Sequence, residues 1–241
     1  MKIKKLFKIN LGRENKYNRD KWVVSSIESL AAGSKILDAG AGPQIYRKYC
    51  DHLVYVSQDF AKYDGGDLSG EVGMHDKEFH YEGLDIVSDI TSIPEEDASF
   101  DAILCTEVLE HVPYPVHALT EFSRLLKPGG TLLLTAPFNS LTHFAPYFFC
   151  TGFSIYWYQY HLNKLGFELK EAIPNGNYYG VLAQEIERLP LIASRYSSSK
   201  SGVLFKFSSW VLKLALMKLN KSDKHSDEIQ CYGYHVFAIK K

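Results

Sequence analysis

A strand that ends in a glycine turn constrains the fold of this chain more than any other feature. Ile36 and Leu37 indicate a buried strand that ends on the carboxylate Asp38, and Gly40 and Gly42 follow at once. A strand, a Gly-x-Gly turn and a following helix form a nucleotide-binding crevice at the carboxyl end of a parallel sheet. The glycines allow a sharp turn and the close approach of a ligand, because they carry no Cβ.

The acid beside the turn separates the candidate ligands. A pyrophosphate would sit on the N-terminus of the next helix, where the Asp38 carboxylate would repel it. The third glycine of a dinucleotide fingerprint is also missing, since Ile45 stands in its place. S-adenosylmethionine has no phosphate and carries an ammonium and a sulfonium, so the acid suits it. Taken alone, the segment leaves open a tight strand-to-helix turn with a surface acid.

Strand and helix patterns alternate along the chain. Strands are expected at residues 35–39, 54–57, 85–88, 100–105, 131–135, 167–170 and 234–239. Helices are expected at residues 17–31, 44–50 and 154–165, and through Val116, Leu119, Phe122 and Leu126 up to a breaker at residues 127–130. Residues 61–83 are polar and rich in glycine, which is typical of a long surface loop. The alternation predicts a parallel sheet with right-handed crossovers.

Polar residues close four successive strands, namely Asp38, Asp59, Asp89 and Thr106-Glu107. The carboxyl ends of the strands of an open α/β sheet line one crevice. Asp59 ends the strand after that of Asp38, near the offset at which a carboxylate accepts both ribose hydroxyls. Asp89 can accept from the exocyclic amine of adenine, while Ile90 donates its amide to a ring nitrogen. Each acid alone could be a helix cap or a solvated charge, but four together favour one site.

Ordered motifs extend this pattern: Asp38-Ala-Gly-Ala-Gly42, Gln58-Asp59, Asp89-Ile90, Phe100-Asp101, Glu107-Val-Leu-Glu-His-Val112 and Leu126-Lys-Pro-Gly-Gly130. In this order they resemble the class I S-adenosylmethionine-dependent methyltransferases, and most closely the type-11 branch. The resemblance covers roughly residues 20–173 and the last strand. It implies a Rossmann-like, doubly wound α/β fold, with a seven-stranded, mostly parallel sheet whose last strand is antiparallel.

The resemblance also implies a cofactor, S-adenosylmethionine, and a set of residues that bind it. The glycine turn would hold the methionine end, Asp59 the ribose, Asp89 the adenine, and Glu107 the region beside the methionine tail. The whole set is Asp38, Ala39, Gly40, Gly42, Asp59, Phe60, Asp89, Ile90, Thr106 and Glu107. Gln44 departs from the family, which often has a third glycine at this position.

By the same resemblance, residues 1–241 form a single methyltransferase domain. We expect an N-terminal arm and helix at residues 1–31, a cofactor-binding core at 32–137, an acceptor lid and insertion at 138–231, and the final strand at 232–241.

Residues 137–176 resemble a subset of that branch in which the segment after strand five covers the acceptor. Many similar proteins belong to bacterial surface-polysaccharide or small-metabolite pathways. We therefore expect in-line methyl transfer to an O or N atom of a small molecule, such as a sugar or glycan precursor. Most aromatic side chains here are expected to pack internally and a few to form an apolar acceptor wall: Phe144, Phe148, Phe149, Phe153, Tyr156, Trp157, Tyr158 and Tyr160.

Methyl transfer from a sulfonium needs an aligned acceptor and, for a hydroxyl, a group that removes its proton. His143 on the expected lid is the first candidate base, His111 after strand four the second, and Tyr147 the third. Each of them could instead be a core or capping residue. No Cys, His and acid cluster has ligand spacing along the chain, so no metal is expected.

Composition limits the partners and the compartment. The formal net charge of −1 argues against a dedicated nucleic-acid binder. Four scattered cysteines indicate reduced thiols and, with no apolar run of signal-peptide length, a cytoplasmic protein. On a helical wheel, residues 203–219 place Lys206 and Lys213 opposite an apolar side, which is typical of a helix that packs on its own domain, touches an anionic membrane or pairs in a homodimer.

Three rival classes of protein remain open at this stage. A membrane-associated methyltransferase would act on a lipid-linked acceptor and would need the helix at residues 203–219. A non-catalytic relative would keep Asp38, Asp59 and Asp89 and bind S-adenosylmethionine only. A nicotinamide-dependent oxidoreductase is disfavoured by Asp38 and by the missing glycine.

Overall fold

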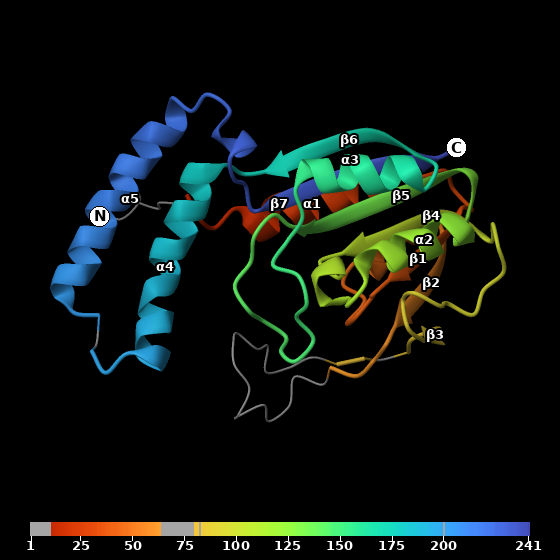
Figure 1. The fold of residues 1–241 in the computed structure, drawn as a ribbon, viewed down its shortest axis with the longest axis horizontal. Helices are drawn as coiled ribbons and strands as arrows, with labels where there is room; N and C mark the ends of the chain where they lie inside the picture. The colour runs from red at the N-terminus through yellow and green to blue at the C-terminus, as the bar shows by residue number, and fades with distance from the viewer. Residues whose placement is uncertain (1–10, 64–79, 82, 200) are drawn as a thin grey trace. The chain divides into compact units, whose positions relative to one another are not determined.

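The computed structural model describes residues 11–63, 80–81, 83–199 and 201–241 (Figure 1). These residues form two compact units. The sheet unit comprises Asp20–Ile173 and Gly233–Lys241, and the helical unit comprises residues 11–19 and Pro174–Tyr232. The domain boundaries that the sequence suggests stay a prediction, and the arm before residue 11 lies outside the described residues.

The sheet contains seven strands in the order β3-β2-β1-β4-β5-β7-β6. Their bounds are β1 Lys35–Ala39, β2 Val54–Asp59, β3 Ile86–Val87, β4 Phe100–Thr106, β5 Leu126–Pro137, β6 Phe167–Asn175 and β7 Gly233–Lys240. β1 pairs in parallel with β2 and β4, whereas β7 runs antiparallel to β5. This arrangement confirms the predicted Rossmann-like, mostly parallel sheet with an antiparallel last strand.

Helices cover both faces of the sheet (Figure 1). On one face Val23 and Ile27 of α1 (Asn15–Glu28) pack against Ile36 of β1 in a fully buried cluster. The next residue of β1, Leu37, is also fully buried and points to the opposite face, because side chains alternate along a strand. There α2 (Pro115–Leu125) and α3 (Ile155–Lys164) lie side by side.

Local sequence explains the two crossover helices. Pro115 opens α2, where its missing N–H and fixed φ cost little, and Leu119, Phe122 and Leu125 form its buried stripe. Ser154 caps α3, because its side-chain oxygen accepts from the backbone N–H of Trp157. Both helices agree with the predicted ranges to within a residue or two.

Two predicted elements differ from the structure. The helix expected at residues 44–50 is only a 3-10 turn, Arg47–Tyr49, because Gln44 adopts a left-handed φ of 54° that an α-helix excludes. α2 ends at Leu125, just before the predicted breaker at residues 127–130, but the strand expected at residues 131–135 already begins at Leu126 and pairs there with Phe100 across an irregularity in the ladder. Gly129 absorbs the irregularity with a φ of 79°.

The helical unit contains a helix that the sequence did not indicate, α4 (Tyr178–Tyr196), together with α5 (Val203–Lys221). Pro190 stands inside α4 and argues against a helix at the level of local sequence. Asn177 nevertheless caps its start by accepting from the N–H of Gly180. Ala183 of α4 and Leu216 of α5 belong to one small buried cluster.

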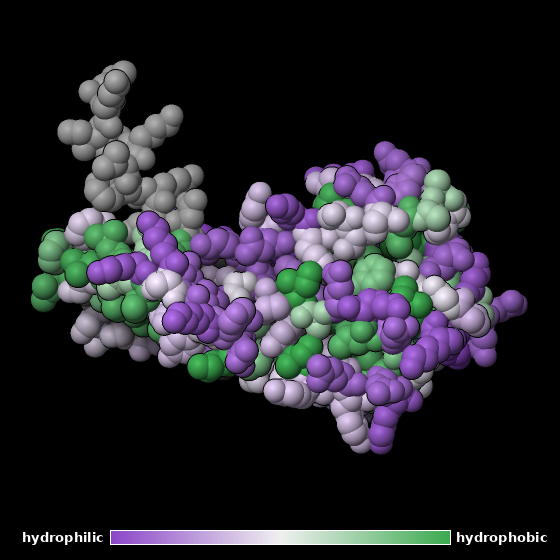
Figure 2. Space-filling model, turned by 90° about the horizontal axis from the view of Figure 1, so that it is seen from above, coloured by the Kyte–Doolittle hydropathy of each residue, from purple (hydrophilic) through white to green (hydrophobic). Residues whose placement is uncertain are grey.

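The lysines of α5 do not form one exposed side, which corrects the helical-wheel expectation. Lys213 is buried and pairs with Glu187 of α4. Much of the exposed surface of α5 is instead apolar, with Leu204 79%, Phe207 60% and Val211 45% exposed. Figure 2 shows hydrophobic side chains gathered on this part of the molecule. Among the described residues, no helix is both long and apolar enough to cross a membrane.

Candidate cofactor and acceptor site

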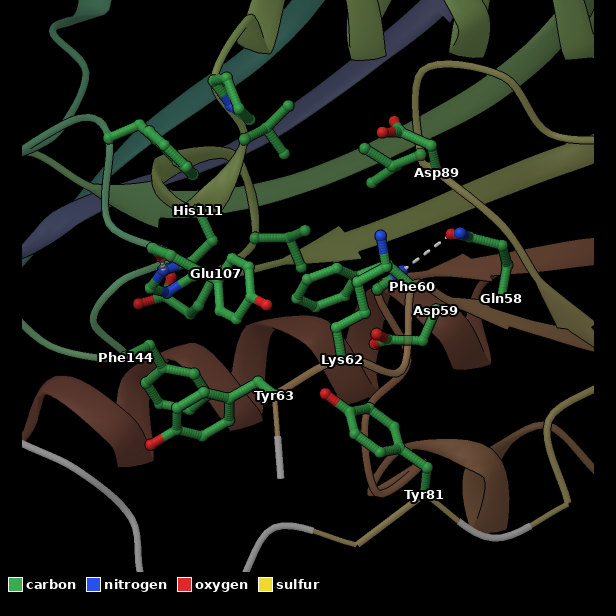
Figure 3. Close-up of a pocket in the computed structure, with 17 residues that line it drawn as sticks. Gln58, Asp59, Phe60, Lys62, Tyr63, Tyr81, Asp89, Glu107, His111 and Phe144 are labelled. Atoms are coloured by element: carbon green, nitrogen blue, oxygen red, sulfur yellow. Dashed lines mark hydrogen bonds between the residues drawn. The ribbon is translucent and has the colours of Figure 1, made fainter. Parts of the chain in front are cut away.

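A cavity of about 270 Å³ opens in the sheet unit at the carboxyl ends of β1, β2 and β4 (Figure 3). Its described lining residues are Gly40, Gln58, Asp59, Phe60, Lys62, Tyr63, Tyr81, Asp89, Ile90, Glu107, Val108, His111, Val112, Pro113, Phe144, Tyr147 and Phe149. Six of the ten predicted cofactor residues are among them. Asp38, Ala39, Gly42 and Thr106 are not, although each is one or two positions from a lining residue in the chain.

The glycine turn after β1 is held by the end of β2. The amides of Gly40 and Ala41 each donate to the carbonyl of Gln58 at 2.9 Å. Gly40 has a φ of 78°, and a Cβ there would lie 2.4 Å from Cγ2 of Val108. Only glycine fits this position, both for its backbone conformation and for its contact with a pocket wall.

Asp38 is buried just before the turn, where its carboxylate accepts from the Tyr55 hydroxyl at 2.7 Å. Burial raises the pKa of this carboxyl to about 7, against the opposing effect of the Tyr55 hydrogen bond. The fold therefore holds a buried acid with a raised pKa beside the glycine turn. A cation bound near it would favour the ionised form.

Asp59 and Asp89 are two of the three acids that line the cavity, and Glu107 is the third. Asp59 accepts from the Gly42 amide at 2.9 Å and from the Ala61 amide at 3.0 Å, and burial raises its pKa. The amide of Thr91 bonds to Asp89 at 2.8 Å and is the main cause that lowers the pKa of that carboxyl. The carboxylates of Asp59 and Asp89 are thus each fixed in orientation by backbone amides while they face the cavity.

Glu107 follows β4 in a strained conformation, with a φ of 54°. Its backbone N–H donates to the carbonyl of Thr135, and the Thr135 hydroxyl donates to its carboxylate at 2.9 Å. A non-glycine residue in the left-handed region costs of order 1–3 kcal/mol and persists where the surrounding structure holds it. The strain here directs the backbone, and with it Glu107, to the edge of the cavity.

Aromatic rings form the wall at the other end of the cavity. Tyr63 stacks on Phe144 with ring centroids 4.2 Å apart, and Phe60 meets Tyr147 edge-on at 5.1 Å. The segment after β2 therefore meets the segment after β5, as Figure 3 shows for Tyr63 and Phe144. Of the aromatic cluster expected to supply an acceptor wall, Phe144 and Phe149 line the cavity.

Other members of that cluster have different places. Phe153 and Tyr158 are buried, whereas Tyr156 is 77% and Tyr160 is 56% exposed. Most of the rings are therefore either packing residues or surface residues.

The two candidate histidines lie together, with ring centroids 4.7 Å apart. His111 lines the cavity, and its Nδ1 is 2.6 Å from the Tyr147 carbonyl oxygen. His143 is outside the described lining, and its Nδ1 is 2.9 Å from the Leu141 carbonyl oxygen. Since a carbonyl only accepts, each Nδ1 carries the proton. Burial lowers the pKa of His111 to about 4, with a smaller contribution from His143.

Glu110 is the residue of this region that sequence reasoning missed. Its carboxylate is 1% exposed, and its Oε1 lies 3.8 Å from Nε2 of His111 and 3.9 Å from Nε2 of His143. Glu110 and His111 are neighbours in the motif Glu107–Val112, so this pair could be seen in the sequence. His143 comes from a separate segment that follows α2 and β5 in the chain, so its place beside Glu110 could not. Lys62 and Tyr81 were also missed, because nothing in the polar loop around them marks them as pocket residues.

Part of this chain matches a family of known proteins. Residues 37–134 match a family model described as a methyltransferase domain. A ubiquinone biosynthesis O-methyltransferase from Xanthomonas oryzae is 33% identical over 111 residues, which cover 43% of each chain. The chain thus aligns with less than half of the length of this relative.

Solved structures share the fold at low identity. A putative sarcosine dimethylglycine methyltransferase from Galdieria sulphuraria has a TM-score of 0.54 at 16% identity, covering 95% of this chain and 88% of its own. A phosphoethanolamine N-methyltransferase 2 from Haemonchus contortus, in complex with S-adenosyl-L-methionine, has a TM-score of 0.50 at 16% identity and covers 93% of this chain and 52% of its own.

Residues 37–134 therefore match a methyltransferase domain of the kind that the motifs of the sequence indicate. The match supports S-adenosylmethionine as the cofactor of this domain. The cavity described here has the features this cofactor requires: a glycine turn, acids for hydroxyl and amine groups, and the apolar side chain of Ile90, which is 8% exposed.

Proposed function

We propose that the protein is an S-adenosylmethionine-dependent methyltransferase that methylates an oxygen atom of a small molecule. One observation carries the proposal: a single cavity has acids and a glycine turn at one end and a histidine among aromatic rings at the other. The first end suits the cofactor and the second a flat or apolar acceptor. The relatives named as ubiquinone biosynthesis O-methyltransferases support an oxygen acceptor.

The chain's own residues have two tasks in such a reaction. The aromatic wall of Tyr63, Phe144 and Tyr147 would hold the acceptor oxygen in line with the sulfonium methyl group. A neutral histidine would accept the hydroxyl proton, and the low pKa of His111 keeps it neutral at pH 7. Of the two predicted bases, His111 is the one that lines the cavity. The base assignment itself stays a prediction.

The finer substrate class is also a proposal. A sugar or glycan precursor follows from the resemblance of residues 137–176, whereas the aromatic wall of the cavity also suits an aromatic ring that carries a hydroxyl. The test is transfer of label from S-adenosylmethionine to a panel of sugar nucleotides, aromatic diols and primary amines. Labelled aromatic diols or sugars support O-methylation. Transfer of label to amines only would overturn the proposed O-methylation.

The same assay separates an enzyme from a non-catalytic binding protein. At a low cofactor concentration Asp59→Ala should reduce labelling through weaker cofactor binding, and the exposed Asp51→Ala should not change it. Retained cofactor binding with no labelling of the panel or of fractionated extract would favour a protein that binds S-adenosylmethionine without transferring its methyl group.

A lipid-linked acceptor is the second candidate, and the exposed apolar surface of α5 favours it. Leu204, Phe207 and Val211 would contact the lipid, while Lys206 and Lys218 are exposed on the same helix and suit anionic headgroups. Turnover of a lipid-linked acceptor should then depend on vesicles and on these apolar side chains. Equal turnover without vesicles would count against this candidate.

A further inference from the structure

Glu110, His111 and His143 form a compact group of ligand atoms beside the acceptor end of the cavity. One carboxylate oxygen and one nitrogen from each imidazole all lie within 4.8 Å of one another. Two of the residues belong to the short 3-10 helix η3 (Leu109–His111) that follows β4, and the third belongs to the segment after β5. Side chains from two segments therefore converge on one point.

Hydrogen bonds fix both imidazoles in the orientation that metal ligands use. Each Nδ1–H donates to a backbone carbonyl, that of Tyr147 for His111 and that of Leu141 for His143. The proton on Nδ1 leaves the lone pair of Nε2 in the ring plane, and both Nε2 atoms face Oε1 of Glu110. Donation of the second ring N–H to a carbonyl is the usual support of a metal-binding histidine.

Distances and burial also suit a shared ion. Ligands that each lie about 2.1 Å from one ion can be at most about 4.2 Å apart. The carboxylate oxygen is 3.8 Å and 3.9 Å from the two Nε2 atoms, both within that limit. The ligand nitrogens of the two imidazoles lie within 4.8 Å of each other, so they would have to approach by at most about 0.6 Å to share an ion. The side chains of Glu110, His111 and His143 are 1%, 14% and 25% exposed, so the group is sheltered but open on its histidine side.

We propose that Glu110, His111 and His143 bind a divalent transition-metal ion next to the acceptor. Two imidazoles and one carboxylate suit zinc, cobalt or iron(II), whereas magnesium prefers oxygen ligands alone. Three protein ligands leave a coordination position for another group, as in catalytic zinc sites. His111 lines the cavity, so the acceptor end of the cavity is where that position would be used.

The chemical role of the ion rests on the proposed O-methylation. With the ion bound, Nε2 of His111 would be a ligand and would no longer act as the base proposed above. An acceptor hydroxyl bound to the ion would instead lose its proton to solvent, because a bound cation lowers the pKa of the hydroxyl. The oxygen would then form a bond to the methyl carbon while the carbon–sulfur bond breaks and its electron pair stays on sulfur. The products are the methyl ether, the neutral thioether and one proton, and no atom changes oxidation state through the ion.

Metal binding can be measured without any acceptor. The full chain is freed of metal with a chelator and titrated with Zn²⁺ by calorimetry and with Co²⁺ by absorption spectroscopy. We expect one ion per chain. His143→Ala and Glu110→Gln should each weaken binding by at least about tenfold, the smallest loss that even a supporting residue of a metal site causes. His117→Ala, an exposed histidine outside the group, should bind like the unaltered chain.

Circular dichroism and binding of S-adenosylhomocysteine check that each variant is folded. If Zn²⁺ and Co²⁺ do not bind the unaltered chain, or if they bind the His143→Ala and Glu110→Gln variants equally well, the site is overturned. If the ion binds and metal-free protein turns over an identified acceptor at the full rate, the site stands but its chemical role is overturned. Failure to find any acceptor would affect the proposed function and leave the binding result intact.

Discussion

At the residue scale, Asp59 both supports the turns around it and lines the cavity. Its two carboxylate oxygens hold the amides of Gly42 and Ala61, and the same carboxylate lines the cavity. Asp59→Ala should weaken binding of S-adenosylmethionine and S-adenosylhomocysteine by about 1.5–3 kcal/mol, because the ribose hydroxyls lose a charged acceptor. Isothermal calorimetry measures the change.

Asp51→Ala, at an exposed acid, is the matched control for Asp59→Ala. Asp59→Asn separates the support of the turn from the binding of the ribose, because its amide oxygen can still accept from Gly42 while the negative charge is lost. Unchanged affinity in Asp59→Ala would refute the ribose assignment.

The buried Asp38 should make stability and cofactor affinity depend on pH in opposite directions. Its pKa rises from 3.8 to about 7 in the fold, so between these values the folded chain binds more protons than the unfolded chain. The free energy of unfolding should therefore fall as pH rises from about 4 to about 7. Asp38→Asn removes this dependence, and denaturant unfolding at several pH values measures it.

The affinity for the cofactor should rise with pH, whereas the free energy of unfolding falls. The ammonium of S-adenosylhomocysteine is attracted to the ionised carboxylate, so affinity should rise as pH passes about 7, where Asp38 ionises. Asp38→Asn should remove that rise, and its comparison with the unaltered chain cancels the titration of the ligand itself. Parallel pH profiles for the two proteins would place the ammonium away from Asp38.

At the element scale, α5 presents an apolar surface to solvent rather than a row of lysines. If this helix lies on a membrane, the protein should co-sediment with anionic vesicles and release as salt is added, because charges are screened beyond about 8 Å at physiological ionic strength. Phe207→Ser should reduce the vesicle-bound fraction. Leu189→Ser, which alters an exposed apolar side chain of α4, is the control.

Light scattering completes the test of α5. A dimer that Phe207→Ser converts to a monomer would assign the surface to a second copy of the chain. A protein that ignores vesicles and remains a monomer would contradict both modes of association.

At the scale of the whole molecule, cofactor binding should order one unit and not the other. All described residues that line the cavity belong to the sheet unit, and they come from the carboxyl ends of β1, β2, β3 and β4 and from the segments after β2, β4 and β5. Saturation with S-adenosylhomocysteine at one hundred times its dissociation constant should stabilise the fold by about 2.7 kcal/mol.

Hydrogen exchange locates that stabilisation. Amides at residues 60–63, 107–111 and 144–149 should gain protection, while those of α5 serve as an internal reference that does not change. Protection of α5 comparable to that of Phe144 and Tyr147 would show that the cofactor acts on more than its own unit.

Much of the cofactor side was readable from the sequence alone. The strands β1, β2 and β4 and the acids at their ends follow local rules, because apolar runs mark buried strands and glycines mark turns. Parallel strands place their carboxyl ends at one edge, so the sequence was enough to assign Asp59, Asp89 and Glu107 to one crevice. Even the departure at Gln44 has a local meaning, since its φ of 54° lies in a region that glycine adopts most easily.

Only the tertiary structure showed which residues meet at the acceptor end of the cavity and which side of α5 is exposed. The meeting of Glu110 with His143 joins the segment after β4 to the segment after β5, and the stacking of Tyr63 on Phe144 joins the segments after β2 and β5. No periodicity encodes such contacts, because they depend on how loops close and pack rather than on the residues beside them. A helical wheel likewise shows which side chains of α5 share a side. Which side is buried depends on the neighbouring helix, where Glu187 pairs with Lys213 and leaves Phe207 exposed.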